Sequence, residues 1–219
     1  MLNVNLLDYF NEKNKQFMEK CINHNKECLG IYSNKLKEIA KDHQQNLEYI
    51  LEEKKYQDEF MICAFMFNYI KDYEVMFKYL TSFIKEVTNW AICDSLVSSL
   101  KIIKKNKEKF LKDLHSFYID DEFSLRFILI ILKCYYLEDK YFSDILYYLD
   151  QIKADYYYVK MGKAWLLCDM LIKLFDKTTS YIKQNKLDQE TKKYLERKIK
   201  DTYRLTNEQK LLIINILGE

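Results

Sequence analysis

The scarcity of turn-forming residues constrains the fold of this 219-residue chain more than any other feature. Pro is absent, and Gly occurs only at positions 30, 162 and 218. Sheet proteins need such residues in their tight turns, whereas helices can be joined by short loops of Asn, Asp, Ser and Lys. Hydrophobic residues make up 49% of the chain and charged residues 31%, which indicates a folded protein. The sequence therefore predicts an all-α protein.

The charge of the chain is nearly balanced, with 35 Lys and Arg against 33 Asp and Glu and a net charge of +2. This balance argues against a strongly basic nucleic-acid binder, although it allows a local basic stripe. Only three of the basic residues are Arg, at positions 126, 197 and 204. In so Lys-rich a chain, each remaining guanidinium is a weak indication of a role that Lys cannot fill.

Six cysteines lie in apolar helical stretches without a CxxC pair, so we expect small buried thiols in a reducing compartment. His24, His43 and His115 lack ligand spacing, and we expect no metal site. The most apolar run, residues 127–132, is too short to span a bilayer, and the amphipathic start "MLNVNLLDYFNEK" does not resemble a signal peptide. We therefore expect a soluble cytoplasmic protein.

Helix-start signals recur along the chain at intervals of about 33 residues. After an N-terminal helical region that ends near Leu51, we expect one series of helices to start near Tyr56, Asn89, Asp121, Asp155 and Asp188, and their partners near Asp72, Asn106, Asp139, Asp176 and Thr206. Two helices per repeat predict an α-solenoid whose inner helices line a concave binding surface. A compact multi-helix bundle is the alternative.

Four charged residues occupy the same position in this repeat. Asp94 and Arg126 each lie five residues after a helix start, and the same offset gives Lys160 and Lys193. An acid followed by three cations would form a column across consecutive inner helices. We take Arg126, Lys160 and Lys193 as candidate nucleic-acid contacts.

Each of the two tryptophans, Trp90 and Trp165, could be either a core residue or part of a functional site. Trp90 and Asp94 are four residues apart, so both side chains lie on one face of a helix. Arg126 lies in the apolar segment "EFSLRFILIILKCYY", where a guanidinium must reach water or find an anion. An ion pair with Asp94 is one interpretation, and contact with a phosphate is the other. By spacing alone, Trp165 fits a core position.

Four ordered segments resemble one known family. They are "TNWAICDSLVSSLK", "DEFSLRFILIILKCYY", "DYYYVKMGKAWLLCDMLIK" and "KIKDTYRLT". These segments are similar to the AlkD-like DNA alkylation repair family of HEAT-like-repeat proteins. The resemblance extends from about Leu29 to the C-terminus and is strongest over residues 88–204. It implies a single HEAT-like-repeat DNA alkylation repair domain over residues 1–219.

The resemblance also implies an activity. Members excise cationic N3- or N7-alkylated purines, such as 3-methyladenine and 7-methylguanine, from duplex DNA without flipping the base into a deep pocket. By resemblance, Trp90, Asp94 and Trp165 flank the damaged nucleotide, and Arg126 supports them. We therefore expect an alkylpurine DNA glycosylase that acts as a monomer, without metal or cofactor, in the bacterial cytosol or nucleoid.

Two departures from the family pattern favour a second interpretation. The N-terminal stretch "LGIYSNKLKEIAKD" lacks the Arg and the Pro that are usual there, and Cys134 and Cys168 stand where basic residues are expected. Because phosphate contacts dominate affinity for DNA, losing several can abolish binding. The alternatives are a catalytically silent HEAT-like module that binds nucleic acid or protein, and an unrelated helical scaffold.

Overall fold

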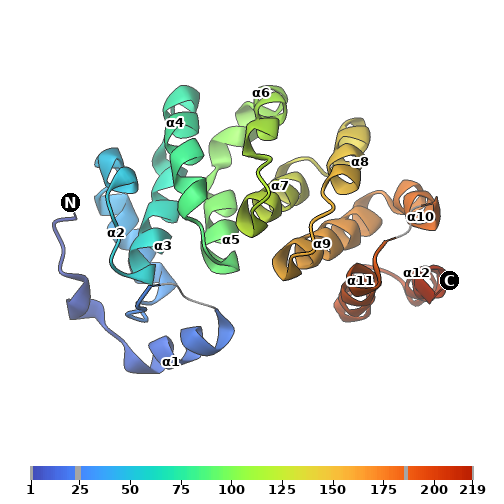
Figure 1. The fold of residues 1–219 in the computed structure, drawn as a ribbon, viewed down its shortest axis with the longest axis horizontal. Helices are drawn as coiled ribbons and strands as arrows, with labels where there is room; N and C mark the ends of the chain where they lie inside the picture. The colour runs from blue at the N-terminus through green and yellow to red at the C-terminus, as the bar shows by residue number, and fades with distance from the viewer. Residues whose placement is uncertain (1, 23–25, 185–186, 219) are drawn as a thin grey trace. The chain divides into compact units, whose positions relative to one another are not determined.

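The computed structural model describes residues 2–22, 26–184 and 187–218 (Figure 1). In these ranges the chain forms twelve α-helices and seven short 3-10 helices, and no strand occurs among them. Within each part of the chain, the first helix of a repeat packs against the first helix of the next repeat, which is the packing of an α-solenoid. The prediction of an all-α solenoid is therefore confirmed. Within the same ranges, none of the helices combines the length and the apolar character that a membrane crossing requires.

The chain divides into two compact units, Met1–Phe117 and Tyr118–Glu219, which we call the N-terminal and C-terminal units. Each unit has its own buried apolar core. The prediction of a single functional domain over residues 1–219 stays a prediction, as does the concave binding surface.

In the N-terminal unit, α3 lies between α2 and α5 and is buried on nearly all sides. The α-helices are α1 (Glu12–Cys21), α2 (Ser33–Asp42), α3 (Gln57–Met66), α4 (Tyr73–Phe83), α5 (Trp90–Ser99) and α6 (Lys107–Asp113). Short 3-10 helices precede α1, precede α3 or extend the ends of the others: η1 (Leu6–Tyr9), η2 (Leu47–Leu51), η3 (Phe67–Tyr69), η4 (Ile84–Glu86), η5 (Lys101–Lys105) and η6 (Leu114–Phe117).

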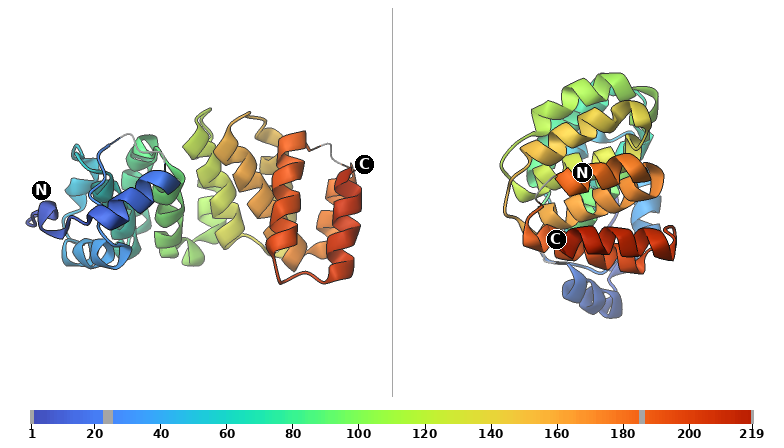
Figure 2. Two further views of the ribbon diagram at one scale, coloured as in Figure 1. Left: turned by 90° about the horizontal axis from the view of Figure 1, so that it is seen from below. Right: turned by 90° about the vertical axis from the view of Figure 1, so that its right-hand side faces the viewer.

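In the C-terminal unit, α9 is the central helix and packs against α7, α10 and α11. The elements are α7 (Glu122–Tyr135), η7 (Asp139–Tyr141), α8 (Phe142–Gln151), α9 (Tyr157–Lys173), α10 (Phe175–Gln184), α11 (Gln189–Asp201) and α12 (Asn207–Gly218). Successive helices of this unit stand side by side (Figure 2, left). The centre of α9 is therefore flanked by side chains from two other helices.

Side-chain caps explain why most of the helices begin where the sequence predicts. The Asn89 side chain accepts hydrogen bonds from the amides of Ala91 and Ile92, both at 3.1 Å. Asp72, Asp121 and Asp188 cap α4, α7 and α11 in the same way. These bonds satisfy amides that have no partner within the helix. The predicted starts at these four positions are confirmed.

Two other helices start near the predicted Asp but are not capped by it. The residue that precedes α9 is Tyr156 rather than Asp155, and no side chain caps this helix. Asp139 begins the 3-10 helix η7, so α8 starts only at Phe142. Asp155 lies in the loop before α9 and pairs with Lys160 of that helix, whereas Asp139 lies in η7 and pairs with Lys177 of α10. An acid near a helix start thus does not always cap it.

Gly30 fixes the path of the chain between α1 and α2. Its φ angle is +70°, a conformation that other residues rarely adopt, and a Cβ atom here would lie only 2.4 Å from the backbone nitrogen of Lys15 in α1. The buried carboxylate of Asp58 in α3 accepts hydrogen bonds from the amides on either side, Leu29 at 2.7 Å and Ile31 at 2.9 Å. These contacts anchor α1 to the body of the N-terminal unit.

Candidate functional site

Trp90 and Asp94 lie on α5 of the N-terminal unit, one turn apart. Trp90 is the first residue of the helix and directly follows the Asn89 cap. Both side chains are half-buried, whereas Ile92, Cys93 and Leu96 on the other face are fully buried. The helix therefore presents the ring and the carboxylate together, partly open to solvent. The interpretation of Trp90 as a fully buried core residue is therefore wrong.

The indole of Trp90 is held by a hydrogen bond that the sequence did not indicate. Its Nε1–H donates to the carbonyl oxygen of Cys21, the last residue of α1, at 3.2 Å. The last carbonyls of a helix have no partner within it, so the bond satisfies both groups. It also fixes the orientation of the ring at the start of α5.

Arg126 lies on α7 of the C-terminal unit and is only 2% exposed. Its Nη1 donates to the carbonyl oxygen of Tyr158 at 3.0 Å. One turn earlier on α7, the Glu122 carboxylate accepts a hydrogen bond from the amide of the same Tyr158 at 2.7 Å. Two side chains of α7 therefore bind the first turn of α9, one through the N–H group of Tyr158 and the other through its carbonyl oxygen. The predicted pair of Asp94 and Arg126 joins residues of different units and stays a prediction.

Trp165 lies in the middle of α9 with cations around its ring. The ring centroid is 5.5 Å from Cζ of Arg126, 5.6 Å from Nζ of Lys133 and 4.4 Å from Nζ of Lys198. Arg126 and Lys133 come from α7, and Lys198 comes from α11. The side chain is half-buried, but within the described part of the chain its Nε1 is buried without a hydrogen-bond partner.

A glycine allows α9 to approach α7 closely beside this ring. A Cβ atom on Gly162 would lie 3.2 Å from Cδ1 of Leu129 and 3.9 Å from Cγ of Arg126. A glycine inside a helix usually costs about 1 kcal/mol relative to alanine. Here it makes room for α7, so that Arg126 reaches Trp165, one turn further along α9.

Asp169, four residues after Trp165, pairs with Lys133 and brings one further cation, Arg204, to the cluster. Its Oδ2 lies 3.2 Å from Nζ of Lys133, and its Oδ1 pairs with Nη2 of Arg204, just beyond α11. Arg204 stands out in the sequence as one of three arginines, whereas Lys133, Lys198 and Asp169 were not predicted as site residues. The spacing of Trp165 and Asp169, the same as that of Trp90 and Asp94, was the available signal.

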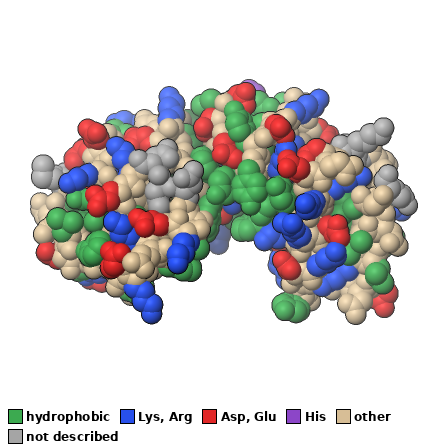
Figure 3. Space-filling model, turned by 60° about the horizontal axis from the view of Figure 1, so that its bottom comes forward, with side chains coloured by type: hydrophobic (Ala, Val, Ile, Leu, Met, Phe, Trp, Pro, Cys, Tyr) green, Lys and Arg blue, Asp and Glu red, His purple; other side chains and the backbone are tan. Residues whose placement is uncertain are grey.

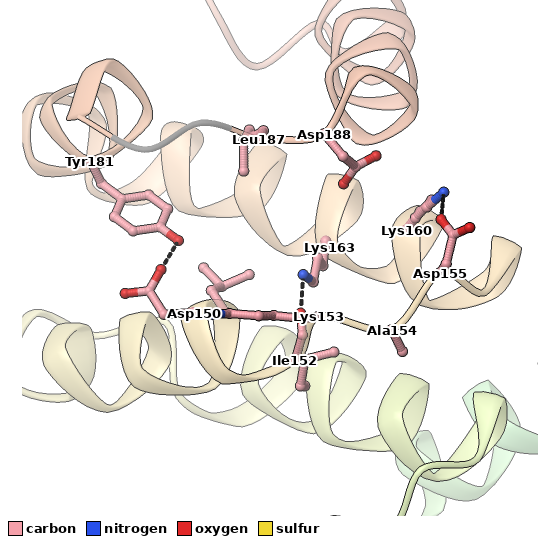
Figure 4. Close-up of a pocket in the computed structure, with 11 residues that line it drawn as sticks. Asp150, Ile152, Lys153, Ala154, Asp155, Lys160, Lys163, Tyr181, Leu187 and Asp188 are labelled. Atoms are coloured by element: carbon pink, nitrogen blue, oxygen red, sulfur yellow. Dashed lines mark hydrogen bonds and ion pairs between the residues drawn. The ribbon is translucent and has the colours of Figure 1, made fainter.

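Lys160 and Lys193 share a predicted repeat position but differ in environment. Lys160 is only 7% exposed, and it pairs with Asp155, as Figure 4 shows, and also with Glu190. Hydrogen bonds to Asp155 and then to Glu190 raise its pKa, so the ammonium stays charged. Lys193 is exposed on α11. The roles of both residues as nucleic-acid contacts stay predictions.

A pocket of about 330 Å³ opens between α8, α9 and the connection that leads into α11 (Figure 4). Its polar groups bond to one another: Lys163 donates to the carbonyl of Ile152, and the Tyr181 hydroxyl donates to Asp150 at 2.7 Å. Burial lowers the pKa of Lys163. Because Ile152 directly follows the last residue of α8, the lysine caps the C-terminal end of that helix. The polar groups that line this pocket thus have structural roles within the C-terminal unit.

The histidines and cysteines of the chain carried two expectations, one about metal sites and one about buried thiols. Among residues 2–22, 26–184 and 187–218, no group of three or more His, Cys, Asp or Glu side chains is arranged to hold a metal ion, and His24 lies outside these ranges. The expectation of buried thiols is wrong for Cys21 and Cys134, which are exposed. Both lie near the end of a helix, on the side away from the core.

One comparison with known proteins identifies the family. The family model described as "DNA alkylation repair enzyme" matches residues 2–198, which include Trp90, Asp94, Arg126 and Trp165. The match begins at residue 2, whereas the predicted resemblance began near Leu29, and it ends before Arg204. No curated protein and no solved structure matches the chain. Since the match covers nearly the whole sequence, the chain belongs to the family of DNA alkylation repair enzymes.

Proposed function

We propose that this DNA alkylation repair enzyme is a glycosylase that excises cationic N3- or N7-alkylated purines, such as 3-methyladenine and 7-methylguanine, from duplex DNA. The observation that carries the proposal is the pair of Trp90 and Asp94, presented together on one half-buried face of α5. A flat ring beside a carboxylate suits a sugar that develops positive charge. Family membership supports DNA as the substrate.

The proposed chemistry starts from the charge of the lesion. A purine alkylated at N3 or N7 already carries a positive charge, so it leaves as a neutral base without a strong general acid. Cleavage of the N-glycosidic bond moves positive charge onto the deoxyribose, which takes on oxocarbenium character. The Asp94 carboxylate stabilises this cation and positions or deprotonates the water that attacks it.

The other three residues have supporting roles in the proposed mechanism. Trp90 packs its ring against the sugar, and its bond to the Cys21 carbonyl keeps the ring in place. In the C-terminal unit, Arg126 orients the Trp165 ring, whose centroid lies 5.5 Å from the Cζ of that arginine. The side chains of Trp90, Asp94 and Trp165 are each half-buried. Such exposure suits a lesion that stays in the duplex rather than entering a deep pocket.

We also propose that the enzyme works as a monomer in the bacterial cytosol or nucleoid, without metal or cofactor. Hydrolysis of a cationic nucleoside needs only water and the carboxylate in this mechanism. Sedimentation of the protein with and without an oligonucleotide duplex tests the monomer, and a protein that sediments as a dimer in both samples contradicts it.

Excision of methylated bases from alkylated DNA tests the proposed function directly. The assay measures 3-methyladenine and 7-methylguanine released by the full-length protein at low salt, where phosphate contacts are strongest. We expect Asp94→Asn to lower the rate about a hundredfold, because removal of a charge-stabilising group costs about 3 kcal/mol. Asp42→Asn, at the exposed end of α2, is the matched control and leaves the rate unchanged.

The outcomes of this assay separate the proposal from its alternative. Lack of release at low salt overturns the glycosylase and favours a catalytically silent HEAT-like module. Release that Asp94→Asn does not slow keeps the glycosylase and removes the mechanism. The alternative is supported by Lys160, a predicted DNA contact that pairs internally with Asp155 and Glu190.

A further inference from the structure

Lys163 differs from an ordinary surface lysine in its environment. It lies half-buried on α9, in the pocket of about 330 Å³ between α8, α9 and the connection that leads into α11. Burial lowers the pKa of its ammonium group. The negative charges of Asp188 and then Asp150 oppose this shift. The positive charges of Lys153 and Lys160 add to it. A lowered pKa leaves more of the lysine as the neutral amine, which is the nucleophilic form.

The amine of Lys163 is held among the residues that line the pocket. Its Nζ donates a hydrogen bond to the carbonyl oxygen of Ile152, and Figure 4 shows the side chain between Ile152 and Asp188. The bond uses one N–H group of the amine. The lone pair of the neutral form therefore stays available to an electrophile that enters the pocket.

The carboxylates of the pocket are already engaged. Asp150 accepts a hydrogen bond from the Tyr181 hydroxyl at 2.7 Å, and Asp155 pairs with Lys160. Asp188 caps α11 through the hydrogen bond that its side chain accepts from the first turn. Figure 3 shows side chains of both charges on the C-terminal unit, at the right. The charge that a ligand meets in the pocket is therefore set by the groups that have no such partner.

Lys153 supplies a positive charge on the solvent side of the pocket. It lies in the connection between α8 and α9, lines the pocket and is exposed. Within the ranges 2–22, 26–184 and 187–218, no hydrogen bond or ion pair engages its ammonium group. Leu149, Ile152 and Leu187 give the pocket apolar walls. The pocket thus combines a nucleophilic amine, apolar walls and an available cation.

We propose that this pocket binds an aldehyde that carries an anionic group, and that Lys163 forms an imine with it. Lys153 contacts the anionic group, and the apolar walls contact the carbon chain of the ligand. A volume of about 330 Å³ lies within the range of small-molecule sites. The inference concerns the C-terminal unit alone and does not rest on the proposed glycosylase.

The proposed reaction balances without a redox partner. The lone pair of Nζ on Lys163 forms a bond to the carbonyl carbon, and the carbonyl oxygen takes up a proton, which gives a carbinolamine. The carbinolamine then releases water. In net terms, the oxygen leaves with both hydrogens of the neutral amine, and a C=N bond replaces the C=O bond. Because the pocket opens to solvent, water molecules carry the protons.

Two sources supply aldehydes of this class. One is a free sugar phosphate in its open-chain form. The other is the ring-opened deoxyribose of an abasic site, which lies between two phosphates of the DNA backbone and is the product that the proposed glycosylase leaves. Both offer an aldehyde carbon to Lys163 and a phosphate to Lys153. Separate arms of the experiment distinguish them.

Reductive trapping on the full-length protein tests the site. The probe is 4-formylbenzoate, an anionic aldehyde, and sodium cyanoborohydride adds a hydride to the imine carbon while water gives a proton to the nitrogen. The resulting secondary amine is located by peptide mass spectrometry. At pH 7 we expect the label mainly on Lys163 rather than on exposed Lys183 of α10, because each unit by which a pKa is lowered raises the neutral fraction about tenfold.

Substitutions assign the two roles. Lys163→Arg keeps a donor for the Ile152 carbonyl and should abolish the label, whereas Lys183→Arg should leave it unchanged. Lys153→Gln should lower labelling by 4-formylbenzoate several-fold more than labelling by 4-formylbenzamide, which is neutral and has nearly the same shape. The comparison of the two probes is needed because loss of the Lys153 charge also lets the pKa of Lys163 rise. Thermal unfolding checks that each variant is folded, and trapping on the unsubstituted protein needs no variant.

Two further aldehydes distinguish the sources. Cross-linking of a prepared abasic-site duplex to Lys163 by cyanoborohydride assigns the ring-opened deoxyribose. Protection of Lys163 from 4-formylbenzoate by glyceraldehyde 3-phosphate, without such a cross-link, assigns a free sugar phosphate. Failure of both overturns the assignment of the ligand as an anionic aldehyde.

Three other results would overturn the proposal. The first is equal labelling of Lys163 and Lys183 at pH 7. The second is a label that persists on the same peptide in Lys163→Arg. The third is an equal effect of Lys153→Gln on the two probes. None of these measurements involves release of a methylated base, so their failure leaves the glycosylase untouched, and a protein without glycosylase activity still gives a result in every arm.

Discussion

The two tryptophans of this chain are both half-buried, but Trp90 begins its helix and Trp165 lies in the middle of a helix among cations. Trp90 is half-buried in the N-terminal unit, and its N–H group is satisfied by the carbonyl of Cys21. Trp165 is half-buried in the C-terminal unit, where its N–H group has no partner among the described residues and cations surround its ring. Both are followed four residues later by an Asp. The same Trp-to-Asp spacing of four residues therefore occurs in two different environments, one with a hydrogen-bonded ring and one with a ring among cations.

A cysteine next to each tryptophan gives the largest measurable contrast. Cys21 is exposed, whereas Cys168 is buried, and burial followed by the charge of Asp169 raises the pKa of its thiol from 9.0 to about 11. The thiolate is the reactive form, so at pH 8 the thiolate fraction of Cys168 is about a hundredfold smaller than that of a thiol with the ordinary pKa. Because Cys21 is exposed and the thiol of Cys168 is both buried and harder to ionise, we expect a maleimide to modify Cys21 much faster than Cys168, as followed by peptide mass spectrometry.

The pH dependence of this labelling has a definite sign. Because the pKa of Cys168 is raised, the thiol stays protonated through neutral pH, and its reactivity should rise towards pH 11. Exposed Cys134, on the same unit, is the control for general access of the reagent. Rapid labelling of Cys168 at pH 7 would show that the region around Trp165 opens in solution.

Replacing each tryptophan by phenylalanine tests the difference in hydrogen bonding. Trp90→Phe removes the bond from Nε1 to the Cys21 carbonyl and should lower the free energy of unfolding by about 1 kcal/mol. Trp165→Phe removes an N–H group without a recorded partner, so its cost should be smaller by that amount. Urea unfolding, followed by circular dichroism, measures both variants. Equal losses would mean that the bond at Trp90 contributes nothing.

Ionic quenching of fluorescence tests the difference in charge, with the smallest expected effect. Iodide is attracted to a positive site, and caesium is repelled by it. In Trp90→Phe, where Trp165 is the only fluorophore, we expect iodide to quench at least twice as strongly, relative to caesium, as in Trp165→Phe. High concentrations of sodium chloride should reduce the contrast by screening. A ratio that is equal in the two variants would contradict a positive environment at Trp165.

Much of the fold could be predicted because its causes are local. The absence of Pro and the scarcity of Gly left helices as the only regular structure. Asn89, Asp121 and Asp188 marked helix starts because a side chain that caps a helix acts on amides two or three residues away. The pairing of Trp90 with Asp94 on one face followed from the helical repeat alone. For these features, short-range geometry was sufficient.

The contacts around the two rings could not be predicted in the same way. Trp90 and Cys21 are 69 residues apart, and Asp169 and Arg204 are 35 apart. Lys160 and Lys193 share a repeat position, yet one is buried against two carboxylates and the other is exposed. Repeat register gives the position of a residue along its helix. It does not give the charges that the neighbouring helices place beside it.

The sequence by itself determined that this chain is all-α, that its helices recur with a period of about 33 residues, and that a ring and a carboxylate share a face of α5. Only the tertiary structure decided that Trp165 lies among Lys133, Lys198 and Arg126. The physical reason is the range of the interactions. Caps and helical faces depend on neighbours within one turn, whereas the electrostatic environment of a ring is the sum over side chains from every helix packed against it.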